Sequence, residues 1–249
     1  MLAALAFAIV LTAPCIAQSP HAPRLTNSVL VPFVGCESDG QTGPMKAPHG
    51  QLRPAAISVT AAKRLAYYKS QYGPGVLAPR GWHCFGMYGS NGSTLLITPE
   101  PISSARLFSR NSEGITGPAI QISLSNGDTS GRFSVAKIIA RVFPTHKDFV
   151  EAVITEGIEP ASSFPFGPYP GDTLNYRSNE VVEFKTPAMT EGLGTASRLS
   201  SDSSPISGVA ILFGEEPNLV HLSLRLPPND DDLSQVIIRQ TERKSVEFR

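Results

Sequence analysis

Cysteine placement is the feature that most constrains how this chain can fold. The sequence holds 3 cysteines, of which Cys15 lies in an N-terminal segment that we predict to be removed. The other two, Cys36 and Cys84, have 47 residues between them. In an oxidising compartment such a pair forms a disulfide by default, and closing a loop of this length stabilises a fold by roughly 4 kcal/mol in the chain-entropy model. We therefore predict a bond that holds two distant segments together.

The N-terminal segment has most features of an export signal. Residues 2–11 form an apolar run, which at about 1.5 Å per residue is too short to cross a hydrocarbon core of roughly 30 Å. Pro14 follows, and Cys15 and Ala17 are small residues at the two positions that a signal peptidase reads. No Lys or Arg precedes the run, which departs from the usual pattern.

From this pattern we predict a signal peptide at 1–17, a disordered leader at 18–28 and a single domain at 29–249, exported to the periplasm or the medium. A buried N-terminal helix is one alternative. Lipid attachment at Cys15 is another, disfavoured by the proline before it. No second apolar span is present, so we expect no membrane anchoring after cleavage.

A metal site is the competing interpretation of the cysteines. Cys36, His49, His83 and Cys84 are residue types that bind zinc. His83 and Cys84 are adjacent, however, and neighbours on a strand point to opposite faces, so they do not easily share one ion. No C-x-x-C spacing supports a metal or a reactive thiolate. We expect no metal and no other cofactor.

Proline and glycine punctuate the chain, with 22 and 21 residues respectively, which predicts many turns and short strands. Asn91-Gly92 between two apolar runs indicates a hairpin with a type I′ turn. Pro32 predicts an edge strand or a strand end. We expect strands at 29–34, 55–59, on both sides of Asn91-Gly92, and at 119–124, 173–176, 181–185, 206–213 and 219–226.

Helical spacing of apolar residues predicts about four helices. The first covers 60–69 and is capped by Ser58 or Thr60, and the second lies within 131–143. The third is capped by Thr145 and ends at Gly157, and the last is capped by Asp230 to Asp232. Strands and helices come in clusters rather than in strict alternation. The fold class predicted is α+β, with a largely antiparallel sheet and one disulfide.

The segment 219–226 alternates with a period of two. Valine and leucine occupy one side, and His221, Ser223 and Arg225 the other, as expected of a half-solvated antiparallel strand. We accordingly predict that His221 lies at the surface, together with His21, His49 and His146.

One group of residues could form a site. The predicted disulfide would bring Glu37 and Asp39 close to Arg80, Trp82 and His83. The carboxylates and the imidazole could perform general acid–base catalysis, and Arg80 and Trp82 could bind a polar ligand. The alternative is structural: turn hydrogen bonds for Asp39, a core position for Trp82 and a carboxylate partner for Arg80.

A second candidate is the glycine-containing bend at 186–195, where Glu191 lies between strands, although this segment can equally be a turn. The formal net charge is +0, so no global field favours nucleic acid. The partner that we expect is an unidentified ligand or a component of the cell envelope.

Three stretches resemble the hallmark segments of a family of exported bacterial proteins of uncharacterised function. They are VPFVGCESDGQTGP at 31–44, VLAPRGWHCFGMYGSNGS at 76–93 and TPAMTEGLGT at 186–195. The resemblance spans most of the mature chain. It implies export, and because the family has no established activity it implies no catalytic residue.

Two classes of function therefore stay open. One is a non-catalytic envelope module that binds a ligand beside Trp82. The other is a hydrolase that uses Glu37, Asp39 and His83.

Overall fold

The computed structural model describes residues 28–109 and 114–245, so the predicted signal peptide and nearly all of the leader lie outside the described residues. The strands are β1 (Val29–Val31), β2 (Phe33–Gly35), β3 (Ser38–Gly40), β4 (Arg53–Ala55), β5 (Leu65–Lys69), β6 (Val76–Pro79), β7 (His83–Gly89), β8 (Gly92–Thr98), β9 (Ala119–Ser125), β10 (Thr173–Tyr176), β11 (Val181–Thr186), β12 (Ile206–Phe213) and β13 (Asn218–Arg225). The α-helices are α1 (Val59–Arg64), α2 (Ser104–Phe108), α3 (Arg132–Val142), α4 (Lys147–Thr155) and α5 (Ser234–Ser245). Four 3₁₀ turns are η1 (Pro144–His146), η2 (Ala161–Ser163), η3 (Leu193–Ala196) and η4 (Pro228–Leu233).

The main element is an eight-stranded sheet in the order β10-β11-β12-β13-β9-β8-β7-β3. Every neighbouring pair in it is antiparallel except β3 and β7, which run parallel at one edge. A three-stranded sheet, β2-β5-β6, and a two-stranded ladder, β1-β4, complete the β structure. Pro32 separates β1 from β2, as its missing N–H requires. The predicted α+β class with a largely antiparallel sheet is confirmed.

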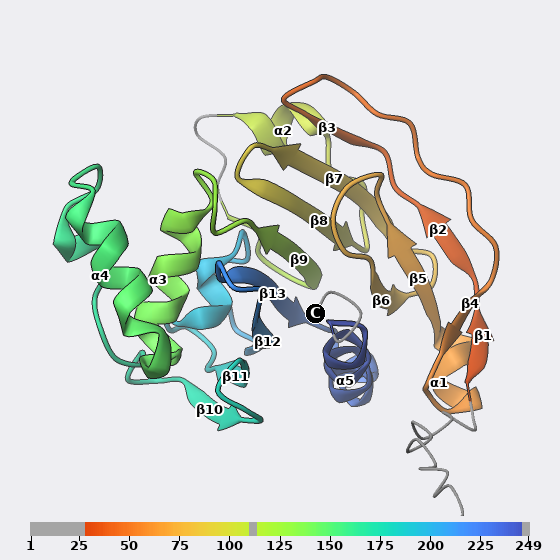
Figure 1. The fold of residues 1–249 in the computed structure, drawn as a ribbon. Coiled ribbons are helices and arrows are strands. Elements are labelled where there is room, and N and C mark those ends of the chain that lie inside the picture. The colour runs from red at the N-terminus through yellow and green to blue at the C-terminus, as the bar shows by residue number, and fades with distance from the viewer. Residues whose placement is uncertain (1–27, 110–113, 246–249) are drawn as a thin grey trace, which may run out of the picture.

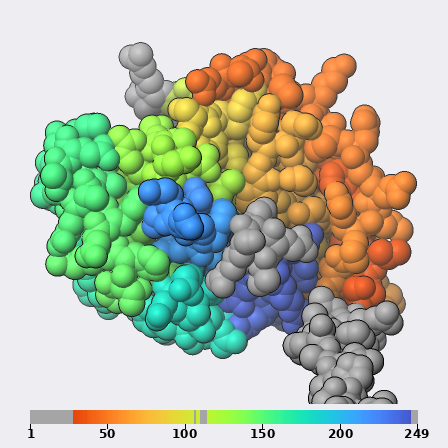
Figure 2. Space-filling view, in the orientation of Figure 1, coloured from red at the N-terminus to blue at the C-terminus, as the bar shows by residue number. Residues whose placement is uncertain are grey.

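Two different layers cover the large sheet (Figure 1). Helices α3 and α4 pack on one face, with α3 over β9 and β13, in a core that includes Val135, Phe143 and Phe184. The small sheet and α5 cover the other face, in a core that includes Leu65, Ile122 and Ile237. In the space-filling view (Figure 2) the N-terminal part of the described chain and the segment that carries α3 and α4 lie on opposite sides of the molecule.

Part of the predicted helix at 60–69 is wrong. Ser58 does cap a helix, since its Oγ accepts a hydrogen bond from the N–H of Ala61 at 3.1 Å, but α1 ends at Arg64 and the chain continues as β5. The β5 residues 65–68 are all buried between β2 and β6. Burial on both faces favours an extended segment over a helix with one apolar stripe, so tertiary packing overrides the local helical pattern.

Two predicted boundaries also differ. Thr145 lies inside η1 and α4 begins at Lys147, because Pro144 starts a separate tight turn. The helix does end before Gly157, which has a φ of 68°. Asp230 to Asp232 lie in η4, directly before α5, and α2 is a one-turn helix that the periodicity did not predict.

The hairpin around Asn91 is confirmed, but its turn is not the predicted one. Ser90 and Asn91 form the two-residue loop between β7 and β8. Among the described residues Met189 alone combines a side chain with a positive φ, so Asn91 lacks the conformation that a type I′ turn requires. Gly92 begins β8 with a φ of 133°, and a Cβ there would lie 1.9 Å from the carbonyl oxygen of Leu124. Because β9 lies so close to position 92, only glycine fits there.

The prediction of a half-solvated face on β13 is wrong. His221, Ser223 and Arg225 are 4%, 1% and 2% exposed, because α3 and the neighbouring loops cover this face. The Arg225 guanidinium donates to the carbonyl oxygens of Ile115, Gly117 and Ser200 at 2.6 to 2.8 Å. Within residues 28–109 and 114–245, no helix has the length and apolar character needed to cross a bilayer.

Candidate functional site

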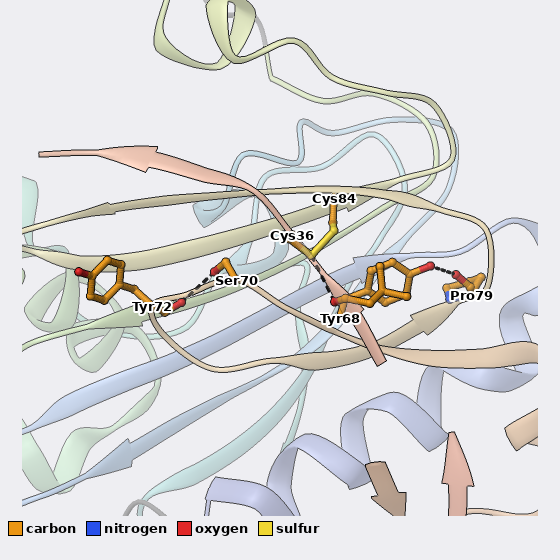
Figure 3. The surroundings of a disulfide bond; sticks show 7 residues. Cys36, Tyr68, Ser70, Tyr72, Pro79 and Cys84 are labelled. Carbon is orange, nitrogen blue, oxygen red and sulfur yellow. Dashed lines mark hydrogen bonds between the residues drawn. A yellow bond between two sulfur atoms is a disulfide. The ribbon is translucent and has the colours of Figure 1, made fainter. Parts of the chain in front are cut away.

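A disulfide joins Cys36 to Cys84, with a Cα–Cα distance of 5.4 Å, and the predicted bond is confirmed. Figure 3 shows it beside Tyr68, whose buried hydroxyl donates to the carbonyl oxygen of Pro79 at 2.7 Å. Cys36 follows β2 of the small sheet and Cys84 lies in β7 of the large sheet. The bond thus connects the two sheets and sets the course of the acidic segment that follows Cys36.

Three of the predicted site residues line one groove. Glu37, Trp82 and His83 border a hollow of about 390 Å³ next to the disulfide. Apolar and small polar residues complete its walls, namely Val34, Phe85, Leu96, Thr98, Pro101 and Ile102. Glu37 and His83 are exposed and Trp82 is half-buried. No lysine or arginine lines the groove, so its charge comes from the carboxylate of Glu37. We call it the Trp82 groove.

Asp39 and Arg80 lie apart from this groove and have structural contacts. The Asp39 Oδ1 atom accepts a hydrogen bond from the N–H of Gly40 at 2.7 Å. Arg80 donates to the carbonyl oxygens of Ala62 at 2.6 Å and Leu65 at 3.0 Å. These carbonyls belong to the end of α1, where a helix leaves acceptors without partners inside the helix. Arg80 therefore stabilises the junction of α1 and β5.

The second candidate segment, 186–195, is a bend held by its own hydrogen bonds. The Thr186 hydroxyl donates to Asp172 Oδ1 at 2.7 Å and accepts from the N–H of Gly194 at 3.0 Å. Asp172 Oδ2 also accepts from the N–H of Leu193 at 2.8 Å. Glu191 is exposed at the border of a separate hollow. The local contacts account for the geometry of this bend without a ligand.

A polar cavity of about 510 Å³ lies between α3 and the large sheet, and the sequence analysis missed it. His221 is in its lining, so its predicted surface position is wrong. Burial lowers the pKa of His221 to about 4, which leaves the imidazole neutral near pH 7. The signal for this cavity was present in the alternation of β9 and β13, whose second face carries Ser, Gln, His and Arg.

A pair of acidic residues lies apart from these cavities, where Arg239 and Glu242 of α5 meet Glu183 of β11. Arg239 forms an ion pair with Glu183, and its Nη1 atom lies 3.1 Å from Glu242 Oε2. Burial, together with the hydrogen bond and the charge of Glu183, raises the pKa of Glu242 to about 7. The carboxyl group of Glu242 is therefore partly protonated near neutral pH.

In the part of the chain that the structure describes, no group of three or more His, Cys, Asp or Glu residues could hold a metal ion. Comparison with known proteins finds no matching family model, no matching curated protein and no matching solved structure.

Proposed function

We propose that this protein is an exported binding module that holds a polar ligand in the Trp82 groove and has no catalytic activity. The observation that carries the proposal is the placement of Glu37, Trp82 and His83 in one groove. The adjacent disulfide ties the two sheets that form the walls. A covalently fixed groove loses little conformational freedom when a ligand enters, which favours binding.

The chemistry of the groove suggests the class of ligand. An indole offers a flat apolar face, and a carboxylate accepts hydrogen bonds from hydroxyl groups. The lining contains Glu37 but no cationic side chain, which disfavours an anion. A neutral sugar ring fits both properties, because it presents an apolar face of C–H groups and an equatorial set of hydroxyls.

Export is supported by the disulfide, since such bonds persist in oxidising compartments and are rare in the cytosol. The apolar segment at 2–11 followed by small residues at 15 and 17 supports the same location. The periplasm and the medium both satisfy these conditions. An envelope glycan is accordingly the ligand that we propose to test first.

The chain contains 1 tryptophan, so fluorescence excited selectively at tryptophan reports on this groove alone. Soluble glycan fragments of the cell envelope, added to the purified mature protein, should shift the emission of Trp82 in a saturable way. Glu37→Gln should weaken binding by about tenfold, because a hydrogen bond to a charged group is lost. Asp39→Asn is the matched control and should bind normally. Failure of every glycan to bind folded protein, measured by calorimetry as well, would refute the proposal.

A hydrolase remains the second candidate, because Glu37 and His83 line the same groove. A carboxylate that orients a catalytic imidazole lies about 2.6–3.2 Å from it. The described residues include no hydrogen-bond partner or ion-pair partner of the His83 side chain, which favours the binding module. A broad hydrolase panel tests this alternative: turnover that His83→Ala abolishes would replace the binding proposal with an enzymatic one.

A further inference from the structure

The cavity beside α3 has a polar floor. Thr94, Ser123 and His221 lie opposite one another on β8, β9 and β13, and all three line the cavity. Gln121 joins them, and its Oε1 accepts a hydrogen bond from the N–H of Arg198 at 2.9 Å. The other face of the same strands is packed with leucine, isoleucine and valine. Burying polar side chains under a helix costs free energy that apolar side chains would not cost, so the floor has the composition of a binding surface.

Helix α3 forms one wall of the cavity with a polar stripe. Ser134, Lys137, Ile138 and Arg141 line it, and their spacing of three and four residues places them on one side of the helix. The opposite side of α3 carries Val135, Ile139 and Val142 and packs in the core. The helix is thus anchored by one side and presents two cations with the other.

Of the two cations that line the cavity, Arg141 has no counter-ion among the described residues. The Arg141 guanidinium lies 4.0 Å from the centre of the Tyr169 ring and donates to the carbonyl oxygen of Gly167 at 3.2 Å. No described carboxylate forms an ion pair with Arg141. Lys137 does form an ion pair, with Glu159 at 2.8 Å. No Asp or Glu is among the lining residues. The Arg141 guanidinium, fixed in place by Tyr169 and the carbonyl of Gly167, therefore faces a polar space and has no counter-ion among the described residues.

We propose that this cavity is a second binding site, which takes a small hydroxylated organic anion such as a sugar acid or a sugar phosphate. The oxyanion group binds Arg141, with Lys137 adding charge, because a planar guanidinium matches a carboxylate or a phosphate in geometry. The hydroxyl groups of the ligand bind the floor, where Thr94 and Ser123 offer hydroxyls and His221 a neutral imidazole. The cavity volume of about 510 Å³ is within the range of small-molecule sites.

This site is independent of the Trp82 groove, because the two share no lining residue. The two ligands also differ in charge, since the Trp82 groove contains a carboxylate whereas the cavity beside α3 is lined by two cations. Binding at the two sites can therefore be measured separately, and the failure of one proposal leaves the other intact.

Isothermal titration calorimetry with glucose 6-phosphate, glucuronate and glucose, carried out on the Glu37→Gln variant so that sugar binding in the Trp82 groove is weakened, tests the proposal. We expect at least one of the two anions to bind and glucose to bind more weakly than that anion. A preference for glucose 6-phosphate identifies phosphate as the recognised group, and a preference for glucuronate identifies a carboxylate. Equal affinity for glucose, or no binding of either anion up to about 10 mM, overturns the proposal.

Matched substitutions on one helix show where the anion binds. Arg141→Gln should weaken anion binding by about tenfold or more, because a charge-assisted hydrogen bond is lost. Arg132→Gln is the control, since Arg132 lies on the same helix and pairs with Glu156 outside the cavity. Lys137→Gln provides a second variant if Arg141→Gln is poorly folded by circular dichroism. Equal affinity in wild type and both cavity variants contradicts the proposal, and Trp82→Phe should leave anion binding unchanged.

Discussion

Removal of the disulfide between Cys36 and Cys84 should cost this fold a large share of its stability. The two residues are 48 positions apart in the sequence. The chain-entropy model gives a stabilisation of about 4 kcal/mol for a closed loop of this length, because the bond restricts the unfolded chain. Domains are commonly stable by about 5–15 kcal/mol in total, so the loss would be severe. The native contacts of β3 with β7 would persist, because backbone hydrogen bonds also hold them.

The measurement is urea denaturation of a double variant, Cys36→Ala with Cys84→Ala, followed by circular dichroism and by Trp82 fluorescence. Wild-type protein unfolded in the presence of a thiol reductant is the control, and it should show the same midpoint as the variant. The dependence of free energy on urea should become steeper, because an unlinked chain exposes more surface when it unfolds. A loss of less than about 1 kcal/mol, with unchanged steepness, would show that the bond does not constrain the unfolded state as we reason.

The remaining predictions concern buried polar groups. The pKa of His221 in the fold is about 4, below its value in the unfolded chain, so the unfolded state takes up a proton first as pH falls from about 6.5 to 4. The free energy of unfolding should therefore fall over that window by up to about 3 kcal/mol. Urea titrations at several pH values should show a smaller fall in His221→Gln. For Glu242 the free energy of unfolding should change with pH in the opposite direction, since its pKa in the fold is raised to about 7. Stability should fall as pH rises from about 4.5 to 7, by about 1–2 kcal/mol because the contact with Glu183 and Arg239 is partly solvated. Glu242→Gln should remove this pH dependence. Arg225→Met should lower the free energy of unfolding by about 3 kcal/mol or more, because three buried carbonyl oxygens lose their donor; a thermal melt within a degree or two of wild type would contradict this.

Much of the β structure could be predicted, because alternation and turn residues are local signals. The strands β9 to β13 and the β7–β8 hairpin lie within a residue or two of their predicted positions. The exchange of helix for strand after Arg64 could not be predicted, since β5 exists only because β2 and β6 flank it. The alternation in β13 likewise revealed two different faces without revealing that α3 covers the polar one.

Only the part of the candidate site that the disulfide holds together could be predicted from the sequence. The disulfide brought Glu37, Trp82 and His83 to one groove. It did not bring Asp39 and Arg80 to the groove, because each binds a partner elsewhere. Asp39 accepts from a neighbouring N–H and Arg80 donates to the end of α1, and no spacing in the sequence predicts these contacts. The cavity beside α3 depends on three strands and a helix that are distant in sequence, so only the assembled sheet reveals it.

The position of β13 inside the large sheet has a consequence for how the chain matures. This strand lies between β12 and β9, and its pairing with β9 joins Leu219 to Ser125. Because β13 follows every other strand of this sheet along the chain, the two halves of the sheet have no common neighbour until β13 has been made. Pairings between such distant residues form slowly, so the joining of the two halves of the sheet should be a late step in folding.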